Sequence, residues 1–599
     1  MWRFIQNTFS SLLGTLLALG ILAFGGLFLL LIFIPFSQEP AVNLPDDAIL
    51  VVDLSMSIND KPPSKTIDQV ISEAISNSEI IQVSLRKLIN AIKYAKTDND
   101  IKGLYLTGSL QSINFGSGYA AMTEVRQALL DFKTSGKPIH AYMVNAMPRD
   151  YFVMSCADTI YMNPFGELMF NGLGVEMMFY ANAFEKWGIG AQSVRVGTFK
   201  AGIEPYMQDH MSEENREQTM VLIEGIWDSM AAEVAESRGI ALDELGRLVG
   251  SNRSFDANSA KEGGLVDELV YFDEILNTLK EVAGDDQEER TFAQIDIASY
   301  MEAKSVSGSS RSDNEVAVIY LEGVIVGGEG DPNQVGGDRI ARRIRDVRLD
   351  DDVKAVVLRV NCPGGGAQAA EIIQREVRLL KETKPVVASM GYVAASGGYW
   401  VSTYSNRIFA QENTITGSIG VYGLIFNVQE IANNFGITWD YARTHEYAGS
   451  STITRPQTEA ELKQLEESTA WYYEKFLEKV AESRGMEIEF LDTVGQGRTW
   501  LGKDAIKHGL VDEIGGLDAA IEHAAELAKL EDYSIRDYPR GNNFDELLSA
   551  MFEGRDLDVS VDPATGFIRK LQKDLEWLKT FNDPQGIYLL PEINFQFFK

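Results

Sequence analysis

The chain contains two copies of one sequence unit. Val-Ala-Glu-Ser-Arg-Gly occupies Val234–Gly239 and recurs at Val480–Gly485, and Gly-Leu-Val-Asp-Glu occupies Gly264–Glu268 and recurs at Gly509–Glu513. The spacing between the two motifs is nearly the same in both places, so the copies stay in register over a long stretch. A duplication of this length restricts the chain to two similar folded units, and every difference between the copies becomes informative.

The copies differ at two places where catalytic groups could sit. In the second copy, the glycine-rich run Asn361–Gly366 is followed by Ala394-Ala-Ser-Gly-Gly398. The matching part of the first copy reads Met147-Pro-Arg-Asp-Tyr151 and has no serine. Conversely, Lys200 of the first copy aligns with Ala448 of the second. One copy keeps a serine among glycines and the other keeps a lysine, as expected of a serine/lysine hydrolase assembled across a duplicated fold.

Each copy alternates apolar runs with segments of helical periodicity. Such alternation predicts βαβ units, and therefore an α/β fold with a mainly parallel sheet and helices outside it. The expected strands are Ala48–Val52, Ile101–Leu106, Pro138–Val144, Val316–Tyr320, Val353–Val360 and Pro385–Met390, and the expected helices are Val83–Lys96, Met122–Thr134, Arg339–Val347 and Ala370–Thr383.

The 599 residues are long enough for two domains and an appendage. Residues 284–314 are rich in polar and small residues and have the composition of a linker. The expected domains are a membrane anchor (1–45), a copy with the lysine (46–283), the linker (284–314), a copy with the serine (315–540) and a C-terminal extension (541–599).

The N-terminus predicts a single transmembrane helix. No charge follows Arg3 until Glu39, and Leu12–Phe36 is a run of 25 apolar residues. As a helix this run would be about 37 Å long, enough to cross a bilayer core of about 30 Å. It is too long for a cleaved secretory signal and has no small-residue cleavage site. The flanking charges place Arg3 inside and everything after about residue 45 outside.

Composition excludes several other classes of function. The formal net charge of −33 argues against a nucleic-acid partner, because a phosphate backbone is bound by basic surfaces. The two cysteines, Cys156 and Cys362, lie in apolar segments and are expected to be buried thiols. The sequence has no metal-ligand cluster and no phosphate-binding loop, and we expect no cofactor.

Ser396 is the candidate nucleophile. A serine hydroxyl needs a base to take its proton and donors to stabilise the oxyanion that forms. The Gly397 N–H is one candidate donor, if a helix begins there, and the N–H of Gly365 or Gly366 at the end of a strand is a second. Alternatively, these glycines only permit tight turns and Ser396 is a helix N-cap.

The general base that would take the proton of Ser396 is harder to identify from the sequence than the serine itself. None of the five histidines lies between Ser396 and Thr444, and His445 is the only one near the position that aligns with Lys200. A lysine replaces histidine when burial lowers its pKa, and Lys200 has apolar and small neighbours. The alternatives are a Ser396–His445 pair, or an ordinary lysine whose stem packs on apolar surface at Lys200.

Four segments together resemble signal peptide peptidase A in its long bacterial form. They are Val194–Pro205, Asn361–Gly365, Met390–Trp400 and Thr416–Gly420, and they occur in the order typical of that family. The resemblance covers nearly the whole chain. It implies a tandem duplication of a Clp/crotonase-like fold, a ββα superhelix, behind one transmembrane helix.

The resemblance also implies roles and partners. Ser396 would be the nucleophile, Lys200 the general base, and Ser418 the group that orients the lysine. Gly365 or Gly366, with Gly397, would form the oxyanion hole. The family implies a homotetramer on the bacterial inner membrane that faces the periplasm and degrades cleaved signal peptides and other apolar peptides.

Two positions depart from the family pattern, and two other functions stay open. Cys362 replaces a serine and Tyr392 replaces an aspartate, which puts any polar contact of the aspartate in doubt.

The same fold in crotonases binds acyl-CoA and uses carboxylates as acid and base, and no suitable glutamate pair lies on the glycine-rich loops. A catalytically inactive membrane scaffold is the other alternative, against which the intact Ser396 and Lys200 argue.

Overall fold

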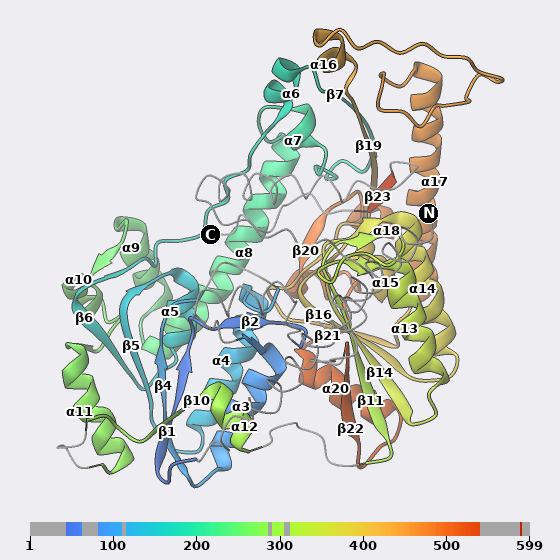
Figure 1. Ribbon diagram of the computed structural model, residues 1–599. Coiled ribbons are helices and arrows are strands. Elements are labelled where there is room, and N and C mark those ends of the chain that lie inside the picture. Colours follow the sequence, from blue (N-terminus) through green and yellow to red (C-terminus); the bar gives the residue numbers. More distant parts are fainter. Residues whose placement is uncertain are drawn as a thin grey trace, which may run out of the picture.

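The computed structural model describes residues 44–62, 82–110, 115–285, 290–304, 312–539 and the backbone of 587–589 (Figure 1). The predicted transmembrane helix at Leu12–Phe36 lies outside these residues. Within the described ranges, every helix is too short or too polar to cross a bilayer.

The first copy forms a mainly parallel sheet, as the strand–helix alternation predicts. Its central strands are mostly buried, because helices cover both faces of such a sheet. In spatial order they are β10 (Gln294–Asp296), β1 (Ala48–Asp53), β4 (Ile101–Thr107), β5 (Ile139–Ala146), β6 (Thr159–Leu168) and β8 (Phe255–Asp256), with β9 (Glu268–Leu269) paired to β6. Its main helices are α3 (Leu85–Thr97), α4 (Tyr119–Lys133), α5 (Pro148–Met154), α8 (Glu213–Arg238), α9 (Leu242–Ser251), α10 (Ala257–Glu262) and α11 (Phe272–Ala283).

The second copy repeats this arrangement beside the first (Figure 1). The order is β20 (Thr499–Leu501), β18 (Ile415–Gly417), β16 (Val386–Ala395), β14 (Val353–Cys362), β11 (Glu315–Glu322) and β22 (Ser534–Tyr538), with β17 (Arg407–Ala410) joining β16 to β21 (Glu513–Ile514). The helices are α13 (Gly337–Leu349), α14 (Ala367–Lys381), α15 (Gly397–Ser402), α17 (Glu459–Arg484), α18 (Ile488–Val494), α19 (Gly502–Ala505) and α20 (Leu517–Leu527). The six strands and four helices expected from the sequence are all present, with ends shifted by a few residues.

The repeated sequence motifs make the same contact in each copy. The arginine that ends α8 or α17 bonds the aspartate of the following Gly-Leu-Val-Asp-Glu motif: Arg238 to Asp267, and Arg484 to Asp512, each at 2.6 Å. In both copies this aspartate also accepts a hydrogen bond from the backbone of the neighbouring strand. The motifs recur because they hold a helix to a sheet edge, and they carry no catalytic group.

A second repeated contact fixes the alignment around the candidate nucleophile. Tyr151 and Tyr399 each donate their hydroxyl to the backbone carbonyl of an equivalent leucine, at 2.7 and 2.9 Å. Tyr151 lies on α5, the short helix after β5, and Tyr399 lies on α15, the short helix after β16. In this register Ser396 aligns with Pro148, so the first copy keeps the strand–helix turn and has lost the hydroxyl.

A third sheet joins the two copies. Its order is β13 (Val335–Gly336), β12 (Ile325–Val326), β15 (Gly365–Gly366), β23 (Ile587–Leu589), β19 (Val421–Asn427) and β7 (Gly190–Val196). β7 comes from the first copy and pairs antiparallel with β19 of the second along its whole length, at the top of Figure 1. The chain that follows β7 therefore enters the second copy.

Residues 284–314, which have a linker's composition, contain two elements of the first copy. β10 extends the first sheet by pairing in parallel with β1, and α12 (Ile297–Ala303) packs beside it. Only a few of their side chains, among them Ile295, Ile297 and Tyr300, reach the core. So little apolar content leaves no periodic signal in the sequence.

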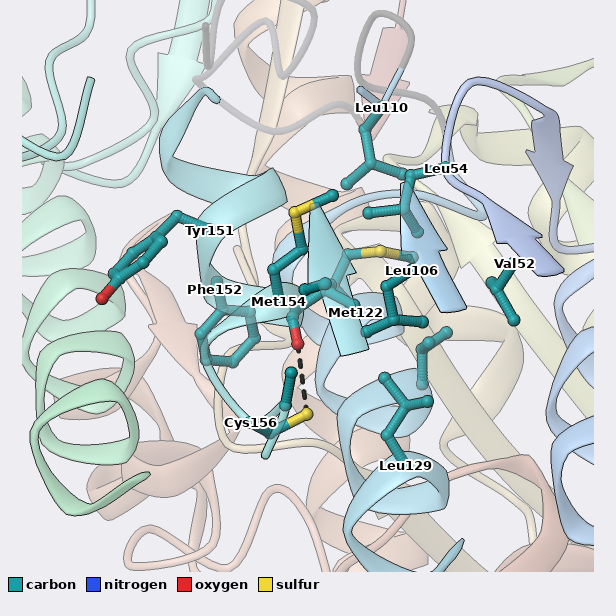
Figure 2. Packing of buried hydrophobic residues seen from close by; sticks show 14 of the residues in the cluster. Val52, Leu54, Leu106, Leu110, Met122, Leu129, Tyr151, Phe152, Met154 and Cys156 are labelled. Atoms are coloured by element: carbon teal, nitrogen blue, oxygen red, sulfur yellow. Dashed lines mark hydrogen bonds between the residues drawn. The ribbon is translucent and has the colours of Figure 1, made fainter. Parts of the chain in front are cut away.

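Both cysteines are buried free thiols, as expected. Figure 2 shows Cys156 in the apolar core of the first copy, where its thiol donates to the Val153 carbonyl at 3.1 Å. The same apolar cluster includes Tyr392, Val393 and Ala395 from the end of β16. The strand that leads to Ser396 is thus packed against the first copy.

Candidate active site

Ser396 lies at the sharp turn between β16 and α15. Its backbone has φ 54° and ψ −113°, a conformation that costs free energy for a non-glycine residue and persists only where the surroundings enforce it. Its N–H donates to the Gly417 carbonyl at 2.8 Å, and its carbonyl accepts the Trp400 N–H at 2.8 Å. Ser396 occupies the N-cap position of α15, but its side chain makes no cap hydrogen bond, so the hydroxyl is not used to cap the helix.

Lys200 reaches Ser396 from the first copy. It follows β7 in a loop, and both side chains are completely buried. Lys200 Nζ lies 3.0 Å from Ser396 Oγ, 2.6 Å from Ser418 Oγ and 3.2 Å from the Ser418 carbonyl oxygen. The structure therefore brings together three of the residues that the sequence singled out. Lys200 is therefore not an ordinary surface lysine with a solvated head group.

The Lys200 loop approaches the second copy closely through glycines. A Cβ on Gly497 would lie 2.7 Å from the Lys200 backbone nitrogen, and one on Gly197 would lie 2.6 Å from the Gln496 carbonyl oxygen. Both glycines have positive φ, of 78° and 114°. Any side chain at either position would push the lysine loop away from the second copy.

A buried carboxylate fixes the same loop from the other side. Glu204 is fully buried and accepts hydrogen bonds from the backbone and hydroxyl of Ser212 and from the Asn215 amide. Gln218, on the same helix α8 as Asn215, donates to the Phe199 carbonyl at 3.0 Å. The segment around Lys200 is thus anchored to the N-terminal part of α8.

Ser418 is held in an unusual conformation as well. It follows β18 with φ 49°, and its N–H donates to the Arg498 carbonyl at 2.7 Å. Two residues earlier, the Thr416 hydroxyl donates to the Ala394 carbonyl at 2.7 Å, which ties β18 to the end of β16. Ser418 therefore presents both its hydroxyl and its carbonyl to Lys200 from a fixed backbone.

The candidate oxyanion donors lie next to the turn at Ser396. Gly365 has φ 152° and Gly364 has φ 112°, so both need glycine. A Cβ on Gly397 would lie 3.2 Å from Gly365 N and 3.1 Å from Gly364 Cα, so the two glycine segments touch. Gly397 is the first residue of α15, where N–H groups have no acceptor within the helix. Gly366 is at the N-cap of α14 and in the β15 ladder.

Comparison with known proteins now identifies the family. The model for Peptidase family S49 matches residues 131–285 and again residues 378–531. The chain belongs to peptidase family S49. It is 32% identical to Protease 4 of Salmonella typhi over 90% of this chain and 89% of that protein, and 31% identical to Protease 4 of Haemophilus influenzae over 96% of each. It is also 31% identical to the chloroplastic serine protease SPPA of Arabidopsis thaliana, over 78% of this chain and 69% of that protein.

Among solved structures, a mutant ClpP1 from Listeria monocytogenes matches with a TM-score of 0.23 and 14% identity, over 34% of this chain and 94% of that chain. The sequence relatives carry the assignment. They support a serine protease of the S49 family, and the family model matches once in each copy.

A buried charged cluster close to the candidate site was not visible in the sequence. Arg359 on β14 is completely buried and bonds the carboxylates of Asp60 and Glu124, at 2.9 Å each. Asp60 also accepts a hydrogen bond from the side-chain amide of Asn361 at 2.6 Å, and Asn361 Oδ1 accepts the Tyr392 N–H at 2.6 Å. Two carboxylates of the first copy thereby hold the strands that lead to the glycine loop and to Ser396.

The charge balance of this cluster is uneven, with two carboxylates around one guanidinium. Burial raises the pKa of Glu124, and Arg359 opposes that rise. The second Glu124 oxygen accepts the Leu517 N–H at 3.0 Å. The contacts of Asp60 and Glu124 with the second copy join residues more than 200 positions apart, and that separation explains why no local pattern predicts them.

The two departures from the family pattern have structural roles. Burial raises the pKa of Cys362 to about 12, and its sulfur accepts the Gly364 N–H at 3.3 Å, so the thiol supports the glycine loop. Tyr392 is buried, and burial raises the pKa of its hydroxyl. A Cβ on Gly118 would lie 2.5 Å from the Tyr392 ring, so the tyrosine packs against the first copy.

His445 lies on an exposed stretch of the second copy. Its Nδ1 is 3.0 Å from the Thr444 hydroxyl, and the hydrogen bond of Ser396 Oγ is made to Lys200. The geometry offers nothing in favour of a Ser396–His445 pair.

Proposed function

We propose that this S49 protease hydrolyses peptide bonds with Ser396 as nucleophile and Lys200 as general base. The observation that carries the proposal is the 3.0 Å contact between Lys200 Nζ and Ser396 Oγ in a completely buried setting. Burial disfavours the ammonium form of an amine, and only the neutral amine accepts a proton. Ser418 supports the pair, because its hydroxyl and carbonyl aim Nζ at the serine.

The chemistry follows the general acid–base pattern. Lys200 Nζ takes the Ser396 proton as Oγ attacks the scissile carbonyl carbon. The carbonyl oxygen becomes an oxyanion that accepts N–H groups of Gly397 and of Gly365 or Gly366. The ammonium then gives its proton to the leaving amine nitrogen, and the C–N bond breaks. A water molecule hydrolyses the acyl-enzyme, with Lys200 again accepting the proton.

The proposed substrates are cleaved signal peptides and other apolar peptides near the membrane. A putative signal peptide peptidase of Enterococcus faecium is 31% identical over 38% of this chain and 67% of that protein. The apolar run Leu12–Phe36 supports a single-pass anchor in the bacterial inner membrane with the catalytic part in the periplasm. Protease treatment of spheroplasts tests this orientation, because protection of residues beyond about 45 would contradict it.

We also propose assembly into a homo-oligomer, a tetramer by the family resemblance. By the register of the duplication, β19 corresponds to residues 173–179 and β7 corresponds to residues 438–444. β7 and β19 pair with each other, whereas residues 173–179 and 438–444 belong to no strand, and each residue of 438–444 is exposed. Pairing of 438–444 with 173–179 of the next subunit would repeat the β7–β19 contact head to tail and could close a ring.

The catalytic proposal is tested with a fluorophosphonate label and an apolar fluorogenic peptide. Wild type is expected to be labelled at Ser396, whereas Ser396→Ala and Lys200→Ala lose labelling and hydrolysis to background. Ser402→Ala and Lys503→Ala are matched controls: Ser402 is a buried serine of α15, and Lys503 also bonds a serine hydroxyl and a carbonyl between the copies, at 3.0 and 2.7 Å.

The double variant is expected to be little worse than either single one, because the two groups act as a unit. Substantial activity in Lys200→Ala would contradict the pair and restore His445 as a candidate. An unlabelled wild type would instead favour the acyl-CoA enzyme or the inactive scaffold.

A further inference from the structure

Arg498 contacts both the loop that carries Lys200 and the turn that carries Ser418. It lies just before β20 in the second copy, and its guanidinium carbon is 4.5 Å from the centre of the Phe199 ring and 5.0 Å from the centre of the Trp500 ring. Phe199 directly precedes Lys200 in the first copy. Trp500 lies on β20, which pairs with β18, the strand that leads to Ser418. The guanidinium therefore lies over one ring from each side of the junction.

The backbone around Arg498 holds the same two elements. The Arg498 carbonyl accepts the Ser418 N–H at 2.7 Å, and two residues earlier the Gln496 carbonyl accepts the Phe199 N–H at 2.9 Å. One short segment of the second copy thus bonds the residue before Lys200 and the serine whose hydroxyl contacts the lysine amine. The side chain of Arg498 adds a second tie between these elements.

The shape of a guanidinium fits this place. A guanidinium stacks on aromatic faces and at the same time donates hydrogen bonds from its edge. Arg498 Nη2 donates to the Glu217 carboxylate on α8 at 2.9 Å, and the two side chains are 23% and 57% exposed. An ion pair with so exposed a carboxylate contributes little, so the two ring contacts account for more of the stabilisation.

The duplicated unit shows which of these contacts is particular to the catalytic junction. By the spacing of the Gly-Leu-Val-Asp-Glu motifs, Arg498 aligns with Arg253 of the first copy. The Arg253 carbonyl also accepts a hydrogen bond, from the Asn171 amide at 2.6 Å. Arg253 is exposed, whereas Arg498 lies over the Phe199 ring. The carbonyl contact is thus common to both copies, and the ring contact is made where the lysine loop meets the second copy.

We propose that Arg498 is a positioning residue for the general base: by holding the Phe199 ring in place, it keeps Lys200 Nζ within reach of Ser396 Oγ. The inference rests on the proposed Ser396–Lys200 pair. Nζ lies 3.0 Å from Oγ, and a misplacement of about 1 Å lowers a rate by up to about a hundredfold. Because Arg498 acts through the lysine loop, its effect falls on the rate of acylation and leaves peptide binding nearly unchanged.

The test measures the rate and the final extent of fluorophosphonate labelling in the full-length protein. Arg498→Met keeps an unbranched side chain and removes the planar cation, and Phe199→Leu removes the ring on the other side of the contact. Each should slow labelling, and lower kcat for an apolar fluorogenic peptide, at least about tenfold with little change in KM. The final amount of label per chain should equal that of the wild type. Arg378→Met is the matched control, because Arg378 lies over the Tyr404 ring at 4.6 Å in the last turn of α14, and it should be labelled at the wild-type rate.

A double variant decides whether the two side chains act through one contact. In the Phe199→Leu background, Arg498→Met should slow labelling by no more than about a further twofold, because the contact is already lost. A wild-type labelling rate in Arg498→Met, equal slowing in Arg378→Met, or fully multiplied effects in the double variant would overturn the proposal. A final amount of label that falls in proportion to the rate would assign the arginine to folding and overturn it as well. A wild type that takes no label refutes the Ser396–Lys200 pair instead, so the two failures are distinguishable.

Discussion

Replacing Arg359 by methionine should destabilise the protein strongly. The guanidinium is completely buried, bonds Asp60 and Glu124 at 2.9 Å, and also donates to the Ser389 hydroxyl at 2.9 Å. Methionine fills similar volume but leaves two buried carboxylates without their cation. Removing one partner of a buried ion pair costs about 3–5 kcal/mol, because the remaining charge is uncompensated.

The assay is urea unfolding, followed by tryptophan fluorescence and circular dichroism. At an m value of about 3 kcal/mol/M, a loss of 3–5 kcal/mol lowers the midpoint by about 1–2 M. Arg342→Met is the matched control, since Arg342 also pairs with a carboxylate, Glu329 at 2.6 Å, but the two side chains are 55% and 59% exposed. An exposed pair of this kind contributes about 0–1 kcal/mol.

A double variant separates charge from packing. Asp60→Asn in the Arg359→Met background removes one uncompensated carboxylate, so it should recover at least about 1 kcal/mol of the loss. If Arg359→Met shifts the midpoint no more than Arg342→Met, the cluster does not hold the copies together. If Asp60→Asn destabilises the Arg359→Met protein further, the cost does not come from unpaired charge.

Three further predictions concern the active site and its support. Ser418→Ala should lower kcat for peptide hydrolysis at least about tenfold with little change in KM, because Lys200 loses the hydroxyl 2.6 Å from its amine; an unchanged kcat would remove Ser418 from the mechanism. Since only a neutral Lys200 accepts a proton, kcat/KM should rise with pH, and a profile that falls between pH 6 and 9 would contradict it. Arg455 and Thr458 hold the pKa of Glu461 at about 2, below its ordinary value of 4.5. The Arg455–Glu461 ion pair therefore stabilises the fold above about pH 4.5, and this stabilisation is lost as pH falls toward 2. The midpoint difference between wild type and Glu461→Gln should therefore be present at pH 7 and vanish near pH 2 in urea unfolding.

The sequence predicted those parts of the fold that repeat or have a local period. The alignment of the two copies placed a lysine in one and a serine in the other, and Lys200 and Ser396 do meet. Buried strands such as Val353–Cys362 are recognisable because nearly every residue is apolar. The motif around Thr416–Gly420 pointed to Ser418, whose contact with the lysine depends on a positive φ that no sequence pattern reports.

The remaining features depend on contacts between distant segments. The pairing of β7 with β19 follows from the packing of one copy against the other, and β7 has no distinctive composition. Asp60 and Arg359 are ordinary charged residues until folding buries them together. β10 and β23 have only three residues each, so they lack the length for a periodic signal.

The turn at Pro148 has a consequence for stoichiometry. If the ancestral unit carried both catalytic groups, a pair of identical units would have formed two equivalent sites. Here proline stands where the first copy would need its serine, and Ala448 stands where the second would need its lysine. Each chain can thus form one site, and a suicide inhibitor should titrate one equivalent per polypeptide. If the proposed pair is the active site, the junction at Pro148 is released from selection for chemistry, so its residues can diverge while those around Ser396 and Lys200 stay constrained.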